Sequence, residues 1–279
     1  MDWKAYNNMS VQDRKKDSIV ILMTACIDPN GMENTALQNP EIRKTQYLEA
    51  IDFYLKRGDF DVVFCENTGM NIFNEIASSQ KYTHLEYLTF RGNDYDKQRG
   101  KSFGEARIIE YAIRNSQRLK SADFIIKITG RVKILNLNKL AKIALKRHYS
   151  ALPVILELSS KDWANSVCFV APKIWLLNTV EKYGELLYDI GYNFEKMLYR
   201  SIVENREIKI YPYYPQIDGI CGANGLPYGN PSFYQRQLCH YNGLFHIYKS
   251  RGDSWNYITA KICWFLCIIR RKIFLFFKG

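Results

Sequence analysis

The sequence lacks the cysteine and histidine patterns that hold metal ions or build a disulfide framework. Its seven cysteines are scattered without a Cys-x-x-Cys pair, and its four histidines have no metal-ligand spacing. The polar N-terminal stretch, residues 1–17, lacks the features of a signal peptide. The cysteines are therefore expected to be reduced thiols of a cytoplasmic protein, most of them buried as small apolar side chains.

Long apolar runs are also missing. In the C-terminal segment 255–279, the longest uncharged block is Ile262–Ile269, eight residues that fall far short of the ~20 needed to cross a bilayer. Bulky apolar residues there alternate with the cations Lys261, Arg270, Arg271, Lys272 and Lys278. This pattern predicts a segment that lies among the headgroups of an anionic membrane. A helix packed on the core, or a dimer contact, is the alternative.

The composition excludes wholesale disorder and indicates an anionic partner. The 279 residues are 47% hydrophobic and 24% charged, as is usual for a folded protein with one main core. Thirty-nine Lys and Arg against twenty-eight Asp and Glu give a net charge of +11. Such an excess attracts anions, and a nucleotide, a nucleic acid and an anionic lipid all fit it.

Apolar runs and amphipathic stretches alternate along the first half of the chain. The apolar runs predict four strands, at 18–27, 61–69, 84–90 and 122–130. Amphipathic stretches predict helices at 40–56 and 101–120, the first of them opened by Asn39 as N-cap and Pro40 in the first turn. This order predicts an α/β fold, with a mainly parallel, Rossmann-type sheet flanked by helices on both faces.

Three of the predicted strands are followed by residues suited to ligand binding. The first ends in Thr24-Ala25-Cys26-Ile27-Asp28, the second in Glu66-Asn67-Thr68-Gly69, and the fourth in Lys127, Thr129, Gly130 and Arg131. Ligands collect beyond the carboxyl ends of parallel strands, so these residues are expected to form one nucleotide site. Asp28, Glu66 and Asn67 suit a base or ribose. Lys127 and Arg131 suit a pyrophosphate. Turns built on Gly69 and Gly130 are the alternative.

Four segments carry a resemblance to a known family: ILMTACIDP with the downstream Arg43 and Gln46-Tyr47, VVFCENTG, RGKSFGEARIIEYAI, and FIIKITGRVKILN. They span about residues 18–136 and resemble the GT-A type glycosyltransferases, in particular small bacterial transferases that build capsule or O-antigen polysaccharide. The later part of the chain resembles that family only loosely, through YDIGYNFEKML and DGICGANG. The resemblance implies a GT-A-like fold, a nucleotide-sugar donor bound in the N-terminal half, with uridine as its base, and a lipid-linked saccharide acceptor bound in the C-terminal half.

The sequence departs from this family at the end of the fourth strand. Many GT-A enzymes place an Asp-x-Asp pair there to hold a divalent cation, but this chain has Lys127-Ile128-Thr129-Gly130-Arg131. No metal or other cofactor is therefore expected, and Lys127 and Arg131 would stabilise the leaving diphosphate. Asp94-Tyr95-Asp96 leaves a metal site open as an alternative. Asp59-Phe60-Asp61 is expected at the amino end of a strand, far from the predicted nucleotide site, with its carboxylates solvated.

The residues assigned to the donor come from the strand ends and from one helix. Lys101 is added to the set because it opens the helix predicted for 101–120, and a helix amino terminus can meet phosphate. A solvated Lys101 is the alternative. The complete donor-binding set is Thr24, Ala25, Asp28, Glu66, Asn67, Gly69, Lys101, Lys127, Thr129, Gly130 and Arg131.

Three carboxylates in the second half are candidates for the base of sugar transfer: Asp162, Asp189 and Glu195. Glu195 is favoured because it lies in a predicted helix, YNFEKMLYRSI, shortly after Gly191, where the chain can turn into the crevice. A surface carboxylate paired with Lys196 or Arg200 is the alternative. The Gly-rich segment 217–230 is either a loop that closes over the substrate or a plain connection.

Together these features predict a glycosyltransferase on the inner face of the bacterial cytoplasmic membrane. Its parts would be an extension (1–17), a donor half (18–136), an acceptor half (137–248) and a membrane-associating tail (249–279). A sugar nucleotidyltransferase is one rival, but TACIDPNGMEN lacks the Gly-rich, Arg-containing phosphate loop that it would carry. A basic protein that binds nucleic acid or membrane without catalysis is another. The prediction includes no nucleic acid partner and leaves the oligomeric state open.

Overall fold

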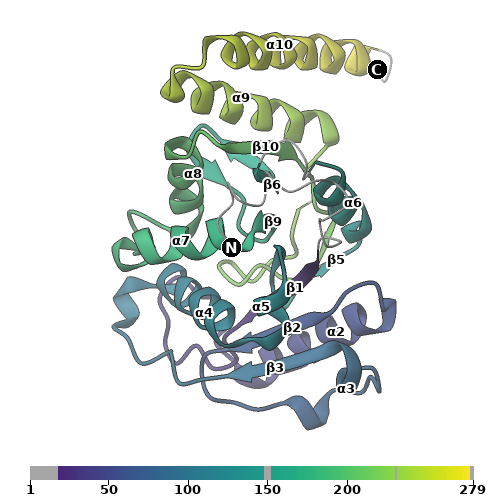
Figure 1. Ribbon diagram of the computed structural model, residues 1–279, viewed down its shortest axis with the longest axis vertical. Helices are drawn as coiled ribbons and strands as arrows, with labels where there is room; N and C mark the ends of the chain where they lie inside the picture. Colours follow the sequence, from purple (N-terminus) through teal and green to yellow (C-terminus); the bar gives the residue numbers. More distant parts are fainter. Residues whose placement is uncertain (1–17, 148–151, 230, 277–279) are drawn as a thin grey trace.

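A seven-stranded sheet forms the centre of the protein (Figure 1), in the order β10-β6-β9-β4-β1-β2-β3. The computed structural model describes residues 18–147, 152–229 and 231–276. The strands are β1 (Ile19–Ala25), β2 (Val62–Glu66), β3 (Leu85–Thr89), β4 (Phe124–Thr129), β6 (Leu152–Leu156), β9 (Cys168–Pro172) and β10 (Ile208–Pro212). Strand β9 is antiparallel to β4 and β6, and the other neighbouring strands are parallel. The predicted α/β fold with a mainly parallel sheet is confirmed.

The four predicted strands are β1 to β4. Strand β2 is buried along its whole length, as its unbroken apolar run indicates. Strands β6, β9 and β10 come from the second half of the chain, so both predicted halves contribute to one sheet. The predicted extension 1–17 lies outside the described residues.

Helices cover both faces of the sheet. Helices α2 (Pro40–Arg57) and α6 (Leu137–Arg147) pack on one face, where Tyr47 and Leu140 join the core. Helices α4 (Lys101–Asn115), α7 (Lys173–Tyr183) and α8 (Phe194–Glu204) pack on the other face, where Phe103, Leu176 and Leu198 join it. The protein therefore has the three layers expected of a parallel sheet.

Local sequence determines where these helices begin and end. At α2, the side-chain oxygen of Asn39 accepts hydrogen bonds from the backbone N–H groups of Glu41 (2.9 Å) and Ile42 (3.2 Å), as predicted for an N-cap. The helix predicted for 101–120 is instead two helices, α4 and α5 (Gln117–Ser121). Ser116 separates them because its backbone is extended and its hydroxyl accepts from Leu119 N (2.9 Å), which caps α5.

Smaller elements complete the chain: α3 (Lys81–His84), the 3-10 turns η1 (Phe73–Glu75), η2 (Lys97–Arg99) and η4 (Gly184–Leu186), and the two-stranded sheets of β5 (Lys133–Ile134) with β11 (Ile217–Asp218) and of β7 (Leu158–Ser160) with β8 (Trp163–Ala164). All seven cysteines are free thiols. Three of them are buried and four are half-buried, so the prediction that most lie fully in the core is wrong.

The last two helices, α9 (Phe233–Arg251) and α10 (Ser254–Phe276), lie side by side beyond the β10 edge of the sheet (Figure 1). Arg236 of α9 forms a buried bidentate ion pair with Glu157, with Nε–Oε1 at 2.8 Å and NH2–Oε2 at 2.5 Å. This pair fastens α9 to the end of β6. Among the helices of the described residues, none combines the length and the apolar character of a membrane span.

Candidate active site

The carboxyl ends of the parallel strands meet at one edge of the sheet. Because β9 runs the opposite way, residues that precede it reach the same edge, and Thr129 N donates to Val167 O (2.9 Å). Gly130 packs so closely on β1 that its N–H donates to Thr24 O (2.9 Å), and a Cβ there would lie 2.8 Å from that oxygen. The end of β4 is thus held against the end of β1, and glycine is required by the close approach.

Glu66 organises the loops that follow three strands. Its Oε1 accepts from Ile27 N (3.2 Å), Thr68 N (2.8 Å) and the Thr68 hydroxyl, and its Oε2 accepts from Met70 N (3.1 Å) and the Thr89 hydroxyl (3.0 Å). The residue is completely buried. Its carboxylate therefore positions the site, and the predicted direct contact with a base or ribose is not what this geometry supports.

The backbone after β1 is held from α2. Arg43 donates to Cys26 O from Nε (2.8 Å) and NH2 (2.6 Å), and Cys26 N donates to the Tyr47 hydroxyl (2.9 Å). Burial raises the pKa of the Cys26 thiol to about 11, so it stays protonated at neutral pH. Arg43 and Tyr47 belong to one of the segments that resemble the GT-A family. Their hydrogen bonds show a structural role, because they hold the backbone that follows β1.

Two of the residues predicted to bind the base or ribose keep polar atoms available. Asp28 is half-buried and uses one oxygen to accept from Asn30 N (2.9 Å). Asn67 is 1% exposed, and its side-chain oxygen has no hydrogen-bond partner in the part of the chain that the structure describes. Gly69 has φ of 81°, so its place in the sequence is explained by the turn that was the alternative. Ala25 is buried in β1.

Lys127 lies deeper than the sequence suggested. Its ammonium forms an ion pair with Glu105 of α4 and donates to Ser166 O (2.6 Å), and the side chain has no exposed surface. The rings of Phe169 and Phe194 lie 5.9 and 5.7 Å from the ammonium. In this arrangement Lys127 reaches no ligand directly, because its donors are directed at protein oxygens. The Thr24 hydroxyl also donates to Glu105 (3.2 Å).

Glu195 lies beside this ion pair. It belongs to the first turn of α8, and its Oε1 accepts from the Ser166 hydroxyl (2.6 Å). Burial raises the pKa of Glu195, the nearby Glu105 carboxylate raises it further, and Ser166 and Lys127 act in the opposite direction. Of the three predicted base candidates, Glu195 is the one that joins the Lys127 and Glu105 group.

Asp189 and Asp162 are placed elsewhere. The Asp189 carboxylate accepts from Lys101 N (3.1 Å) and Ser102 N (3.0 Å), so it occupies the amino terminus of α4. That corrects two predictions, because Asp189 serves as a helix cap and the phosphate position proposed beside Lys101 is already taken by a carboxylate. Asp162 lies in the exposed turn between β7 and β8, where it accepts from the Ser160 hydroxyl (3.2 Å).

Arg131 is covered by a short loop, residues 219–228, which we call the cover loop. Arg131 is 7% exposed, and its NH1 donates to Gln46 Oε1 (2.8 Å) and Ile220 O (3.4 Å). Its Nε is buried without an acceptor, and none of the ion pairs among the described residues includes it. A Cβ on Gly222 would lie 2.4 Å from NH2 of Arg131, so the loop backbone packs closely over the guanidinium.

The cover loop is held mainly by backbone contacts. Ala36 N donates to Gly222 O (2.9 Å), and Tyr228 N donates to Gly219 O (3.1 Å). Tyr228 is the last residue of this loop, and burial raises its pKa, with a smaller opposing effect from the charge of Arg131. The loop therefore packs on Arg131 at the end of β4 and is bonded to the segment that precedes α2.

The two Asp-x-Asp sequences are both engaged in protein contacts. Asp94 pairs with Arg107 (3.0 Å), and Asp96 caps η2 by accepting from Gln98 N (3.0 Å). Within residues 18–147, 152–229 and 231–276, no group of three or more His, Cys, Asp or Glu side chains could hold a metal ion.

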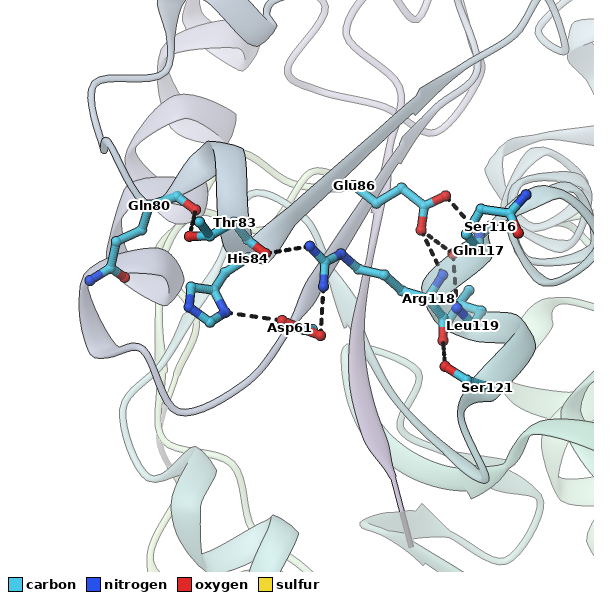
Figure 2. A network of polar contacts seen from close by, with 10 residues as sticks. All are labelled: Asp61, Gln80, Thr83, His84, Glu86, Ser116, Gln117, Arg118, Leu119 and Ser121. Atoms are coloured by element: carbon cyan, nitrogen blue, oxygen red, sulfur yellow. Dashed lines mark hydrogen bonds and ion pairs between the residues drawn. The ribbon is translucent and has the colours of Figure 1, made fainter.

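Asp61 lies before β2, at the amino end of the sheet, as predicted (Figure 2). It is not simply solvated, because its carboxylate pairs with His84 (3.0 Å) and Arg118 (2.6 Å). In the same network Glu86 accepts from the Ser116 hydroxyl (2.7 Å) and from the backbone N–H of Gln117 (2.8 Å). The network joins β2, β3 and α5, which makes it a structural feature of the far edge.

The sequence prediction missed two members of the site, Glu105 and Ser166. Glu105 lies in the predicted helix, one turn from its start. Its neighbours Phe103 and Ala106 do not distinguish it from a glutamate on the solvent-exposed face of a helix. Ser166 lies in a loop without any motif. Its contact with Glu195 joins residues 29 positions apart.

No protein-family model and no curated protein matches this chain. Solved structures with a similar fold include a putative glucose-1-phosphate thymidylyltransferase from Bacillus anthracis, at 11% identity, covering 76% of this chain and 98% of that one with a TM-score of 0.44. A mannosyltransferase from Pyrobaculum calidifontis is 9% identical, covering 93% and 79%, with a TM-score of 0.44. A glycosyltransferase involved in the glycosylation of the major capsid of PBCV-1 is 11% identical, covering 70% of this chain and 82% of that one, with a TM-score of 0.43.

Proposed function

We propose that this protein is a glycosyltransferase that moves a sugar from a nucleotide-sugar donor, a UDP-sugar, to a lipid-linked saccharide acceptor. The product would be a surface polysaccharide such as capsule or O-antigen. The observation that carries the proposal is Arg131, a guanidinium that is 7% exposed, lacks a carboxylate partner in the described residues and stands at the carboxyl end of β4. A buried cation without a counter-charge is costly, and an anionic ligand removes that cost.

A diphosphate is the anion that suits Arg131 best. The planar guanidinium binds phosphate oxygens through paired N–H donors, and its buried Nε has no acceptor among the residues that the structure describes. Asn67, with its unpartnered buried oxygen, and Asp28 stand at the ends of the neighbouring strands, where a base and ribose would extend from that diphosphate. The residues proposed to bind the donor are therefore Arg131, Asn67 and Asp28, with Thr24, Thr129 and Gly130 forming the floor.

Glu195 is proposed as the catalytic base of an inverting transfer. It would take the proton of the acceptor hydroxyl while that oxygen bonds to the anomeric carbon and the bond from this carbon to the diphosphate oxygen breaks. Arg131 would stabilise the charge that develops on the leaving diphosphate. Lys127 would act indirectly. Its ion pair with Glu105 and its hydrogen bond to Ser166 O hold the residues around Glu195 in place. No step in this scheme needs a metal ion.

The cover loop would have to move for a donor to enter. It lies over Arg131, and its backbone oxygen at Ile220 occupies one donor of the guanidinium. Positive φ angles at Gly219 (149°) and Gly225 (72°) mark places where the loop chain turns sharply. This supports the first of the two interpretations of the Gly-rich segment, a loop that closes over the substrate.

The acceptor side is proposed to face the membrane. A lipid-linked saccharide stays at the bilayer surface, so the enzyme would work there as a peripheral protein, held on the inner face by residues 255–279. The β10 side of the sheet carries α9 and α10, whereas the proposed donor residues follow β1, β2 and β4 (Figure 1).

Calorimetric titration tests the donor site. UDP, GDP and CDP are each added to the protein with excess EDTA and again with manganese, and tight binding of UDP in EDTA is expected. Binding only with manganese would contradict the metal-free scheme and point to Asp94 and Asp96. No binding of any diphosphate would overturn the proposed function and favour a protein that binds nucleic acid or membrane.

Arg131→Ala supplies the residue-specific test. The variant should lose most of its UDP affinity but keep its weak affinity for uridine, which lacks the diphosphate. Lys133→Ala is the matched control, because Lys133 lies two residues further on and pairs with Glu49 (3.0 Å) outside the crevice. Equal losses for UDP and uridine would contradict the role assigned to Arg131.

A further inference from the structure

Helix α10 has two different faces. Its inner face packs on α9, where Ala260 and Cys267 are each 4% exposed and the ring of Tyr257 lies 4.9 Å from that of Phe245. The Cys267 thiol also contacts Gln237 Oε1 (3.9 Å). These contacts fix the rotation of α10, so the identity of its outer residues is determined.

The outer face carries a row of large apolar side chains, which we call the outer stripe. Its members are Trp255 (78% exposed), Ile258 (52%), Ile262 (54%), Phe265 (59%), Leu266 (48%) and Ile269 (38%). Apart from the adjacent pair Phe265 and Leu266, they recur at intervals of three and four, which places them along one side of a helix. A helix of 23 residues is about 35 Å long, so the stripe is a large apolar surface exposed to water.

Positive charge borders the outer stripe on both sides. With 3.6 residues per turn, Lys261 and Lys272 lie along one border and Arg270 lies along the other, and all three are exposed. The sequence of α10 contains no Asp or Glu. A second copy of this helix would bring like charges together, whereas an anionic surface would match them.

We infer that α10 docks on an anionic lipid bilayer, lying along the headgroup layer with the outer stripe inserted and Lys261, Arg270 and Lys272 against lipid phosphates. Trp255 and Phe265 supply the aromatic and apolar groups suited to this depth, and the cations remain at the charged surface. This inference deepens the proposed function by naming the surface at which the acceptor is met. The docking itself rests on α10 alone and is measurable without any nucleotide.

Docking through the outer stripe fixes the orientation of the whole protein. Helix α10 is the outermost layer beyond α9 and β10, and β3 lies at the opposite end of the sheet (Figure 1). The half that contributes β6, β9 and β10 would then be next to the bilayer. Strands β1 and β2 would then lie further from the bilayer, on the side where a soluble donor arrives.

Vesicle sedimentation tests the inference with the full chain and without nucleotide. The protein is mixed with phosphatidylcholine vesicles and with vesicles that also contain phosphatidylglycerol, and it should sediment with the anionic vesicles. Ile262→Glu with Phe265→Glu should abolish this. Ile174→Glu is the matched control, because Ile174 is 50% exposed on α7 and not on α10, and it should bind like wild type. Circular dichroism checks that all variants are folded.

The charged border has its own test. Lys261→Ala and Arg270→Ala should each weaken binding to anionic vesicles about five-fold, and added salt should reduce the difference from wild type. Unchanged binding by the double Glu variant would overturn the inference. So would light scattering that shows a wild-type dimer and a monomeric double Glu variant, because the outer stripe would then be covered by a second copy. UDP titration of the same variants keeps failure of docking separate from failure of the donor site.

Discussion

The ammonium of Lys127, a side chain with no exposed surface, forms an ion pair with Glu105, whose side chain is 19% exposed. The pair joins β4 to α4, and Ser166 connects it to Glu195 of α8, since Ser166 O accepts from Lys127 and the Ser166 hydroxyl donates to Glu195. Three elements are thus tied together beneath the crevice. A lysine in this position acts on the reaction through the residues it holds.

Removing the charge of Lys127 should destabilise the fold. Lys127→Met leaves Glu105 without its partner, and loss of one member of a buried pair costs roughly 3 kcal/mol in the free energy of unfolding. Lys127→Met combined with Glu105→Gln should recover at least half of that loss, because no uncompensated charge remains. Urea denaturation of the two variants measures the difference. Equal stability of the single and double variants would mean that the pair is not coupled.

Glu195→Gln should remove transfer and spare donor binding. A general base contributes on the order of 100-fold or more to the rate, so transfer should fall at least that far while the affinity for UDP stays within about two-fold. Asp162→Asn is the matched control, since it makes the same change at a carboxylate in the exposed β7–β8 turn. A normal rate in Glu195→Gln, or a comparable loss in Asp162→Asn, would contradict the assignment.

The pH dependence of stability should also report Glu195. Because burial raises its pKa above the ordinary value of 4.5, the folded protein holds this proton more tightly than the unfolded chain does. The contribution of Glu195 to stability is therefore full at low pH and is lost as pH rises from 4.5 through the raised pKa. Glu195→Gln should flatten that part of the curve of unfolding free energy against pH. An unchanged curve would show that the side chain is solvated.

A disulfide should lock the cover loop. A Cβ on Gly225 would lie 3.7 Å from the Cβ of Ala36, close to the ~3.8 Å of a disulfide. Ala36→Cys with Gly225→Cys, in a Cys221→Ser background, should bind UDP at least ten-fold more weakly when oxidised and recover with reductant. Ala36→Ser with Gly225→Ser carries the same backbone strain without the crosslink. If the oxidised and reduced forms bind alike, the loop does not control entry.

His240 should make the protein sensitive to acid. It is completely buried on α9, Leu158 N donates to its Nδ1 (3.3 Å), and burial lowers its pKa to about 3. The unfolded chain takes up a proton near pH 6.5 while the folded protein does not, so stability falls as pH drops from 6.5 towards 3. The loss between pH 6.5 and pH 4 should be about 3 kcal/mol. His240→Gln should reduce that slope in denaturation curves, and an equally steep curve would contradict it.

Much of the first half of the fold could be predicted because its signals are local. The apolar runs of β1, β2 and β4 and the Asn39 cap of α2 act within a few residues of sequence. Strands β6, β9 and β10 were not predicted, although the alternation of apolar and charged residues in Ile208-Lys209-Ile210 is typical of a half-buried strand. The break at Ser116 was missed because the helical pattern continues across it.

The candidate site, like the fold, could be predicted only in part. The carboxylate at the end of β2 was evident in the sequence. A ligand acceptor and a residue that anchors the backbone look identical there, and only the structure shows that Glu66 makes the backbone contacts of an anchor. The burial of Lys127 depends on α4 and on the loop before β9, and the cover over Arg131 joins residues 89 positions apart. Such contacts arise from tertiary packing, which leaves no mark near the residues themselves.

The contacts of Glu66 also bear on the entropy that a ligand would lose by ordering the protein when it binds. Because its two oxygens hold the chain after β1 and β2 and the end of β3 together, the side of the site that we propose binds the donor is ordered before a nucleotide arrives. A ligand bound there spends little free energy on ordering the protein, and the cover loop is the part left to order. The choice between nucleobases would then be made by a preorganised surface, and the timing of each turnover by the loop above it.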